Sequence, residues 1–269
     1  MRVAWATDIH LNFVEAAGRG EFFAQLRDSD AALISGDIGE SPSVESYLRE
    51  MAESFHKPVY FALGNLDFYR GSIAQTRARV GQTARESKDL VYLTQETVVE
   101  LTPATALVGH DGWADARLGD YEGSQLILND YLLIRELYHW KNGFSLDRAA
   151  LRKSLEAMGD AAARHFETVL PEAAGKYPRV IALTHVPPFR EAAWYNGELC
   201  DDHWLPHFSC RAVGDVLKKV MARYPACKLL VLCGHTHGRG EATIADNIRV
   251  LTGGARYKRP VVQRVFELE

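Results

Sequence analysis

The chain has 269 residues, a hydrophobic fraction of 47%, a charged fraction of 25% and a formal net charge of −4. This composition is ordinary for a globular protein with a sizeable core, and the negative charge disfavours nucleic acid as a partner. No apolar run approaches the roughly 18 residues of a membrane span, so we expect no membrane partner. The first predicted strand begins at Arg2, which leaves no room ahead of it for a signal peptide, and we expect a cytoplasmic protein.

Short apolar runs alternate with a helical pattern in the N-terminal part of the chain. Runs at residues 4–6, 33–35 and 59–63 are typical of buried strands. A helix is predicted between the second and third runs, with Ser41 as its N-cap and Pro42 at its first position. Three further strands at 91–93, 98–101 and 106–108 are too close together for crossover helices, which indicates a mixed edge.

The C-terminal part continues the alternation. Strands are predicted at 180–184 and 229–233, and a helix marked by Leu217, Val220 and Tyr224 leads into the second of them. The last runs, 244–251 and 261–268, are expected to form an antiparallel pair around a turn at Gly253 and Gly254. This order predicts an α/β fold with two packed mixed sheets flanked by helices, forming one domain over residues 1–269.

Two segments lie outside this alternation of predicted strands and helices. Residues 111–176 include an amphipathic helix at about 149–170, and residues 187–210 are rich in aromatic side chains. Both leave the predicted sheets at their carboxyl ends, so both are candidates for a cap over an active site there. The four cysteines show no C-x-x-C spacing, and a disulfide between Cys200 and Cys210 remains open.

Five of the predicted strands end in residues that can bind metal ions. Carboxylate and imidazole ligands together suit Mn, Fe, Zn or Ni. Seven candidates are too many for one tetrahedral ion but fit two ions, for which Asp37 is the natural bridge. Two ions roughly 3.5–4 Å apart can stabilise both the attacking and the leaving oxygen at phosphorus. The candidates are Asp8, His10, Asp37, Asn65, His185, His235 and His237.

The motifs D-x-H, G-D, G-N, H and G-H-x-H occur here in the order in which the calcineurin-like metallophosphoesterases have them, and the chain resembles that family from residue 8 to residue 237. The resemblance implies a four-layer α/β/β/α sandwich and two divalent or trivalent ions, either Mn, Fe or Zn. It implies hydrolysis of a small-molecule phosphate ester by a metal-bound hydroxide, with Asn65 also touching the substrate. One ion would be held by Asp8, His10, Asp37 and His237, and the other by Asp37, Asn65, His185 and His235.

The chain departs from the family pattern at Leu66, where the family usually has a histidine that can assist the leaving group. Leucine cannot donate a proton, and general acid assistance is typically worth about 10²–10⁴ in rate. We therefore expect a modest preference for phosphodiesters or activated esters.

Another group could take over the role of the absent histidine. His110 follows a predicted strand at 105–109 and is the first candidate for a catalytic acid, and the alternative is a loop histidine or one bonded to backbone. Arg190 is a candidate contact for a phosphate oxygen, with a surface salt bridge as the alternative reading. Weaker candidates for the acid are Asp67, Asp111, His203 and His207.

Two other functions remain as alternatives. A non-catalytic metal-binding or partner-binding module could retain the same fold, but the complete ligand set favours an enzyme. A nuclease would need a groove lined with lysine and arginine, whereas the basic residues here are scattered.

Overall fold

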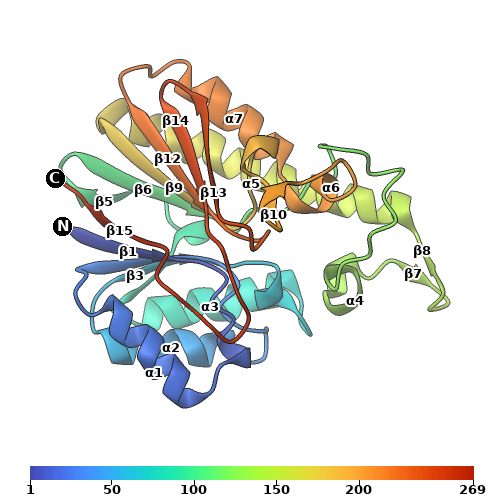
Figure 1. Cartoon of the computed structure of the whole chain (residues 1–269), viewed down its shortest axis with the longest axis horizontal. Coiled ribbons are helices and arrows are strands. Elements are labelled where there is room, and N and C mark those ends of the chain that lie inside the picture. The colour runs from blue at the N-terminus through green and yellow to red at the C-terminus, as the bar shows by residue number, and fades with distance from the viewer.

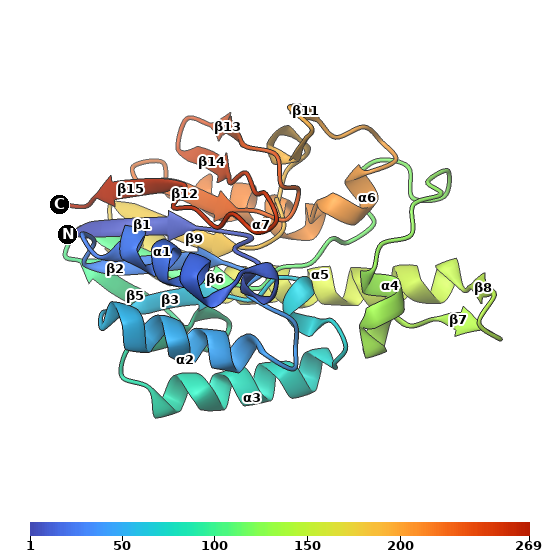
Figure 2. The same ribbon diagram turned by 60° about the horizontal axis from the view of Figure 1, so that its bottom comes forward.

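The computed structural model describes all 269 residues. Two β-sheets pack against each other, and helices cover the outer face of each sheet (Figure 1). This is the four-layer α/β arrangement that the strand and helix pattern predicted. The chain termini lie close together at one end of the sheets, and an arm of mostly short elements extends from the opposite end (Figure 2).

The first sheet has the strand order β15-β1-β2-β3-β4. Its members are β1 (Arg2–Ala6), β2 (Ala31–Ser35), β3 (Val59–Ala62), β4 (Leu90–Tyr92) and β15 (Arg264–Glu267). Strands β1 to β4 are parallel, and β15 is antiparallel to β1. The outer face is covered by α1 (Ala16–Leu26), α2 (Val44–Phe55) and α3 (Ile73–Glu86).

The second sheet has the order β13-β14-β12-β9-β6-β5. Its members are β5 (Val99–Thr102), β6 (Thr105–His110), β9 (Arg179–Thr184), β12 (Lys228–Cys233), β13 (Gly240–Ala245) and β14 (Ile248–Thr252). Helices α5 (Arg148–Lys176) and α7 (Arg211–Met221) cover it. No helix combines the length and apolar character that crossing a membrane requires.

The remaining elements belong to the two segments that lie outside the alternation of strands and helices, 111–176 and 187–210. The first segment holds α4 (Asp130–Leu133) and a hairpin of β7 (Trp140–Lys141) and β8 (Ser145–Leu146), which lie beyond the sheets beside the start of α5 (Figure 2). The second holds β10 (Trp194–Tyr195), β11 (Glu198–Leu199) and α6 (Leu205–Phe208). All four cysteines are free thiols, so no disulfide joins Cys200 to Cys210.

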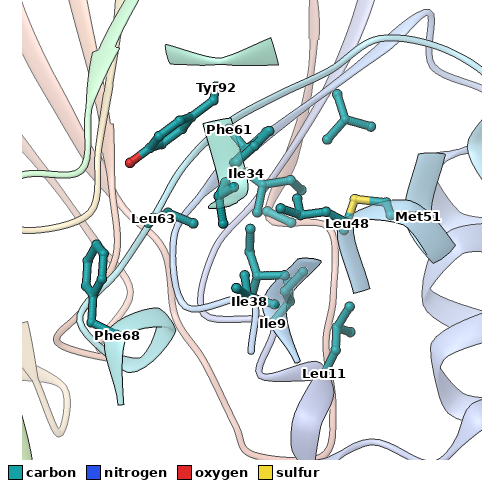
Figure 3. Close-up of a cluster of buried hydrophobic side chains, with 14 of the residues drawn as sticks. Ile9, Leu11, Ile34, Ile38, Leu48, Met51, Phe61, Leu63, Phe68 and Tyr92 are labelled. Carbon is teal, nitrogen blue, oxygen red and sulfur yellow. The ribbon is translucent and has the colours of Figure 1, made fainter. Parts of the chain in front are cut away.

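The buried strands are apolar on both faces because each sheet lies between two layers. In β2, Leu33 belongs to the cluster between the two sheets, whereas Ile34 belongs to the cluster under α1 to α3. Figure 3 shows Ile34 with Phe61 of β3 and Leu48 of α2 in that second cluster. Strands buried on both faces are typical of parallel sheets covered on each side. The continuous apolar runs therefore follow from the layered architecture.

The expected pairing of the last two runs is wrong. Strand β14 pairs with β13 in an antiparallel hairpin and with β12 in parallel, whereas β15 crosses to the other sheet. The run at 244–251 is interrupted by the turn at Asp246 and Asn247, so it supplies the end of one strand and most of the next. The turn at Gly253 and Gly254 instead begins the crossover between the sheets.

A buried carboxylate joins the two sheets just beyond β6. Asp111 Oδ1 accepts hydrogen bonds from Leu63 N and from the Thr94 hydroxyl, both at 2.7 Å. Its Oδ2 accepts from Arg77 Nε at 2.8 Å and from the Tyr92 hydroxyl at 2.7 Å. Burial alone would raise the pKa of Asp111, but Arg77 and these hydrogen bonds hold it below its ordinary value. Asp111 is therefore a structural anion.

We expect Asp111→Asn to lower the free energy of unfolding by roughly 3 kcal/mol at pH 7, because the exchange leaves buried donors without an acceptor. The depressed pKa means that this stabilisation is complete above the unfolded carboxyl pKa of about 3.9 and is lost as the pH falls through the folded value. Urea denaturation at pH 7 measures the stabilisation, and a series continued to pH values below the folded pKa measures its loss. The exposed carboxylate in Asp202→Asn should change the unfolding free energy by less than about 0.5 kcal/mol, and an equally small change in Asp111→Asn would contradict the structural role.

Candidate metal centre

The carboxyl ends of five parallel strands meet at one edge of the packed sheets, which is where open α/β sheets bind ligands. The loops there are joined by backbone hydrogen bonds, from His10 N to Asp37 O at 2.9 Å and from Gly234 N to His185 O at 2.9 Å. All seven candidate ligands lie in these loops. Asp8 and His10 follow β1, Asp37 follows β2, Asn65 follows β3, His185 follows β9, and His235 and His237 follow β12.

Most of these residues have a left-handed backbone. The φ angles are 49° at Asp8, 45° at His10, 53° at Asp37, 70° at His235 and 57° at His237. Such angles are uncommon for residues other than glycine and persist where the surrounding structure enforces them. They turn the chain sharply after β1, β2 and β12, so that the side chains converge.

Glycines before two of the ligands permit close approach of the loops. A Cβ atom at Gly36, which has φ of +92°, would overlap the ring of His185. A Cβ at Gly64 would overlap the carboxylate and backbone of Asp37. The glycines of the G-D and G-N motifs are therefore required by packing at the centre itself.

The first half of the centre consists of Asp8, His10, Asp37 and His237, whose ligand atoms all lie within 4.8 Å of one another. The Nε2 atoms of His10 and His237 are 3.1 Å apart, and Asp8 Oδ1 lies 3.4 Å from His237 Nε2. Burial lowers the pKa of His10 to about 3, so its ring is neutral and can act as a ligand.

The second half consists of Asn65, His185 and His235, together with Asp37. His185 Nδ1 lies 2.8 Å from Ser35 O, and His235 Nε2 lies 3.0 Å from His207 O. A backbone carbonyl only accepts, so these ring nitrogens carry the protons and the other nitrogen of each ring carries a lone pair. Those two lone pairs converge on Asn65 Oδ1, at 3.0 Å from His185 Nε2 and 2.8 Å from His235 Nδ1.

The donor set therefore fits metal ions. Three acceptor atoms converge in the second half, and a cation among them would satisfy all three. In the first half, burial lowers the pKa of His237, but Asp8 and Asp37 outweigh burial and raise it above its ordinary value, so this cluster favours positive charge. Burial and the charge of Asp8 raise the pKa of Asp37, which a cation would counteract. Hydrogen bonds from ligand histidines to carbonyls are the usual outer-shell support of protein metal sites.

Asp37 faces both halves. Its Oδ1 lies 3.4 Å from His185 Nε2, and its Oδ2 lies 4.0 Å from His10 Nε2. The backbone N–H of Leu66 donates to Oδ1 at 2.9 Å and fixes the carboxylate in this orientation. Asp37 thus has the position that a bridging ligand requires.

Asp67 has a structural role that the sequence analysis missed. Its Oδ1 accepts hydrogen bonds from Ile38 N and Gly39 N at 2.8 Å, and its Oδ2 accepts from Gly64 N at 2.7 Å. The fully buried carboxylate thereby joins the loops that carry Asp37 and Asn65. Its place three residues after Gly64, in the G-N-x-D motif, was the signal that could have indicated this role.

A cavity of about 270 Å³ opens beside the centre. Asp37, Asn65, His235 and His237 contribute to its lining, and neither lysine nor arginine does. The two outlying segments contribute as well, so parts of both lie at the site. Other lining residues are Leu66, Tyr69, Leu128, Asn129, Asp130, Tyr195, Phe208, Thr236 and Tyr257.

The other candidate site residues lie elsewhere. The ring of His110 packs 5.2 Å from that of His165 on α5, and its Nδ1 accepts from Gly112 N at 3.0 Å. Arg190 is paired with Asp202 at 2.7 Å on the surface. Neither lines the cavity beside the ligands. Burial lowers the pKa of His110 to about 3, so its ring is neutral at physiological pH.

The two histidines named as weaker candidates for the acid, His207 and His203, do not line the cavity either. His207 is buried beside the hydroxyl groups of Tyr131 and Ser124, at 2.5 and 3.1 Å from its ring nitrogens. His203 is exposed and does not line the cavity. Asn65 was expected to touch the substrate as well, and its amide nitrogen is hydrogen-bonded to Asp130 at 2.8 Å.

We expect Asp37→Ala to lose both ions, because its carboxylate faces both halves of the centre, and His10→Ala to lose one. Elemental analysis of protein loaded with Mn²⁺ and freed of excess metal gives the stoichiometry of each variant. Retention of two tightly bound ions in Asp37→Ala would refute the bridging role.

Comparison with known proteins identifies a family whose model matches this chain and solved structures that are similar to it in fold. The family model described as calcineurin-like phosphoesterase matches residues 1–239. A dimetal phosphatase from Danio rerio is 14% identical, with a TM-score of 0.58 over 94% of this chain and 87% of that one. The phosphopantetheinyl hydrolase of Mycobacterium tuberculosis is 14% identical, with a TM-score of 0.62 over 96% and 90%. A purple acid phosphatase from yellow lupin (Lupinus luteus) seeds is 11% identical, with a TM-score of 0.50 over 100% and 46%.

These solved structures show likeness in fold, because their sequence identities are low. A search of curated protein sequences returned no significant match. The family model spans most of the chain and includes all seven candidate ligands. The protein therefore belongs to the calcineurin-like phosphoesterase family.

Proposed function

We propose that the protein is a binuclear metal-dependent phosphoesterase that prefers phosphodiesters and activated phosphate esters. The observation that carries this proposal is the convergence of seven ligand side chains in two half-sites that share Asp37, beside a cavity of about 270 Å³. Family membership supports phosphate ester hydrolysis as the reaction class.

The mixed imidazole and carboxylate set suits Mn, Fe or Zn. Bound ions would supply Lewis-acid polarisation of the phosphoryl oxygens and a lowered pKa of coordinated water. Asp8, His10 and His237 would hold one ion, Asn65, His185 and His235 the other, and Asp37 both. The protein's contribution is to fix these ligands in place, through the carbonyl partners of the histidines and the backbone partner of Asp37.

The charge of the cavity favours a diester over a monoester. A phosphodiester carries one negative charge at neutral pH, whereas a phosphomonoester carries nearly two, with a second pKa of about 6. The lining contains the carboxylates of Asp37 and Asp130 and no basic side chain of lysine or arginine. A second negative charge on the substrate would therefore have no neutralising partner other than the ions and the histidines.

The walls of the cavity favour an apolar or flat ester group. Tyr69, Tyr195, Phe208 and Tyr257 line it from three parts of the chain, since Tyr195 and Phe208 both belong to the segment 187–210. Aromatic rings provide large apolar contact areas and can stack on a flat substituent. We propose that the segments 111–176 and 187–210 act as partial caps, since each contributes lining residues.

We expect protein reconstituted with Mn²⁺ to hydrolyse bis(p-nitrophenyl) phosphate with a higher kcat/KM than p-nitrophenyl phosphate. The two substrates release the same chromophore, so the comparison isolates the charge and substitution of the phosphate. His235→Ala, which lacks one ligand of the second half, should be inactive on both. A preference for the monoester would refute the diester assignment, and absence of activity with two ions bound would favour the non-catalytic module.

Leu66 offers a second test, because it lines the cavity where the family usually has a histidine. We expect Leu66→His to raise turnover of alkyl esters relative to aryl esters by up to about 10²-fold, since alkoxide leaving groups need protonation more. Leu66→Asn is a matched control that is polar but is no general acid. An equal change on both ester types would contradict the explanation.

A further inference from the structure

The side-chain amide of Asn65 is engaged at both ends. Its Oδ1 faces the lone pairs of His185 and His235, at 3.0 and 2.8 Å. Its Nδ2 lies 2.8 Å from Oδ1 of Asp130, a residue outside the ligand set. A carboxylate can only accept a hydrogen bond, so this contact requires the amide nitrogen to face Asp130 and the amide oxygen to face the two rings.

Asp130 is itself held by a second donor. The Tyr69 hydroxyl donates to the same Oδ1 at 2.7 Å, and Asp130 is almost fully buried. Burial and the charge of Asp130 raise the pKa of Tyr69, so its hydroxyl remains protonated and able to donate. Two donors thus hold one carboxylate oxygen in place at the cavity wall.

The short helix α4, which carries Asp130, is fastened to the chain that follows Asn65. Leu133 O accepts from Arg70 N at 2.8 Å. The Glu136 carboxylate caps the start of α3, where it accepts from the Ser72 hydroxyl at 2.6 Å and from Ile73 N at 3.0 Å. These contacts do not involve the metal ligands, so the position of Asp130 is set independently of them.

We propose that Asp130 is a positioning residue for the second half of the metal centre, and that it sets the orientation of the Asn65 amide. The inference rests on the proposed function. Without Asp130 the amide could turn by half a revolution and present its NH₂ group, which cannot act as a ligand, toward His185 and His235. The segment 111–176 would then contribute to metal binding as well as to the cavity wall.

The geometry confines the expected effect to one ion. The amide that Asp130 orients belongs to the second half, and the side-chain hydrogen bonds of Asp130 reach Asn65 and Tyr69 but not Asp8, His10 or His237. Outer-shell partners of metal ligands typically account for 10–100-fold in metal affinity. We therefore expect Asp130→Ala to weaken one of two Mn²⁺ sites by about 10–100-fold and to leave the other unchanged.

Stepwise Mn²⁺ titration of the metal-free full-length protein tests this, with unbound Mn²⁺ counted by its electron paramagnetic resonance signal. Asp130→Asn keeps an acceptor oxygen for Asn65 Nδ2 and should restore most of the lost affinity. Asp202→Ala removes an exposed carboxylate that does not line the cavity, and this variant should bind both ions as the wild type does. Thermal unfolding of each metal-free variant verifies that it is folded.

The possible outcomes separate failure of this inference from failure of the proposed function. Wild-type affinity for both ions in Asp130→Ala would overturn the inference and leave the proposed function standing. Equal weakening of both sites, or failure of Asp130→Asn to restore binding, would show a general structural role instead. Fewer than two bound ions in the wild-type protein would overturn the proposed function and this inference with it.

Discussion

The centre depends on abrupt reversals of the backbone immediately after the strands. Residues in the left-handed region cost on the order of 1–3 kcal/mol each in this kind of setting, and Asp8, His10, Asp37, His235 and His237 all adopt it. The two packed sheets and the hydrogen bonds between neighbouring loops sustain these conformations. The candidate ligands are consequently pre-organised by the fold, so that little chain entropy would remain to be lost on binding of an ion.

The buried carboxylates differ in the groups that contact their oxygens. Asp67 and Asp111 have both oxygens engaged by N–H or O–H donors of the protein, and they serve as joints between loops. Asp8 and Asp37 accept from backbone N–H groups as well, but they also face imidazole rings and so remain available to cations. Asp130 is intermediate, because one of its oxygens accepts from an amide that faces the centre. Contact with imidazole rings, and not the number of donors, thus separates Asp8 and Asp37 from Asp67 and Asp111.

The layered fold and the strand-end residues were predictable because both depend on local patterns: apolar runs, glycines and the polar residues that follow them. The position of His110 was not, because it shares a face of β6 with Ala106 and Val108, and both faces of that strand are buried. The alternation of side chains along a strand determines which residues share a face. It does not determine whether that face packs against the other sheet or against the helices. The contact between Asp130 and Asn65 joins residues 65 positions apart, and no periodicity reports such a pairing.

The pairing of β15 with β1 has a consequence for how the protein is made. Arg2 lies opposite Glu267, so the strand that leads to Asp8 and His10 obtains its outer neighbour from residues about 260 positions later. At synthesis rates of roughly 5–20 residues per second, β1 waits about 13–50 seconds for that neighbour. During this interval the nascent chain exposes an unpaired strand edge, a template for wrong association. The outer edge of β1, the strand that leads to Asp8 and His10, is therefore without its partner strand until nearly the whole chain has been made.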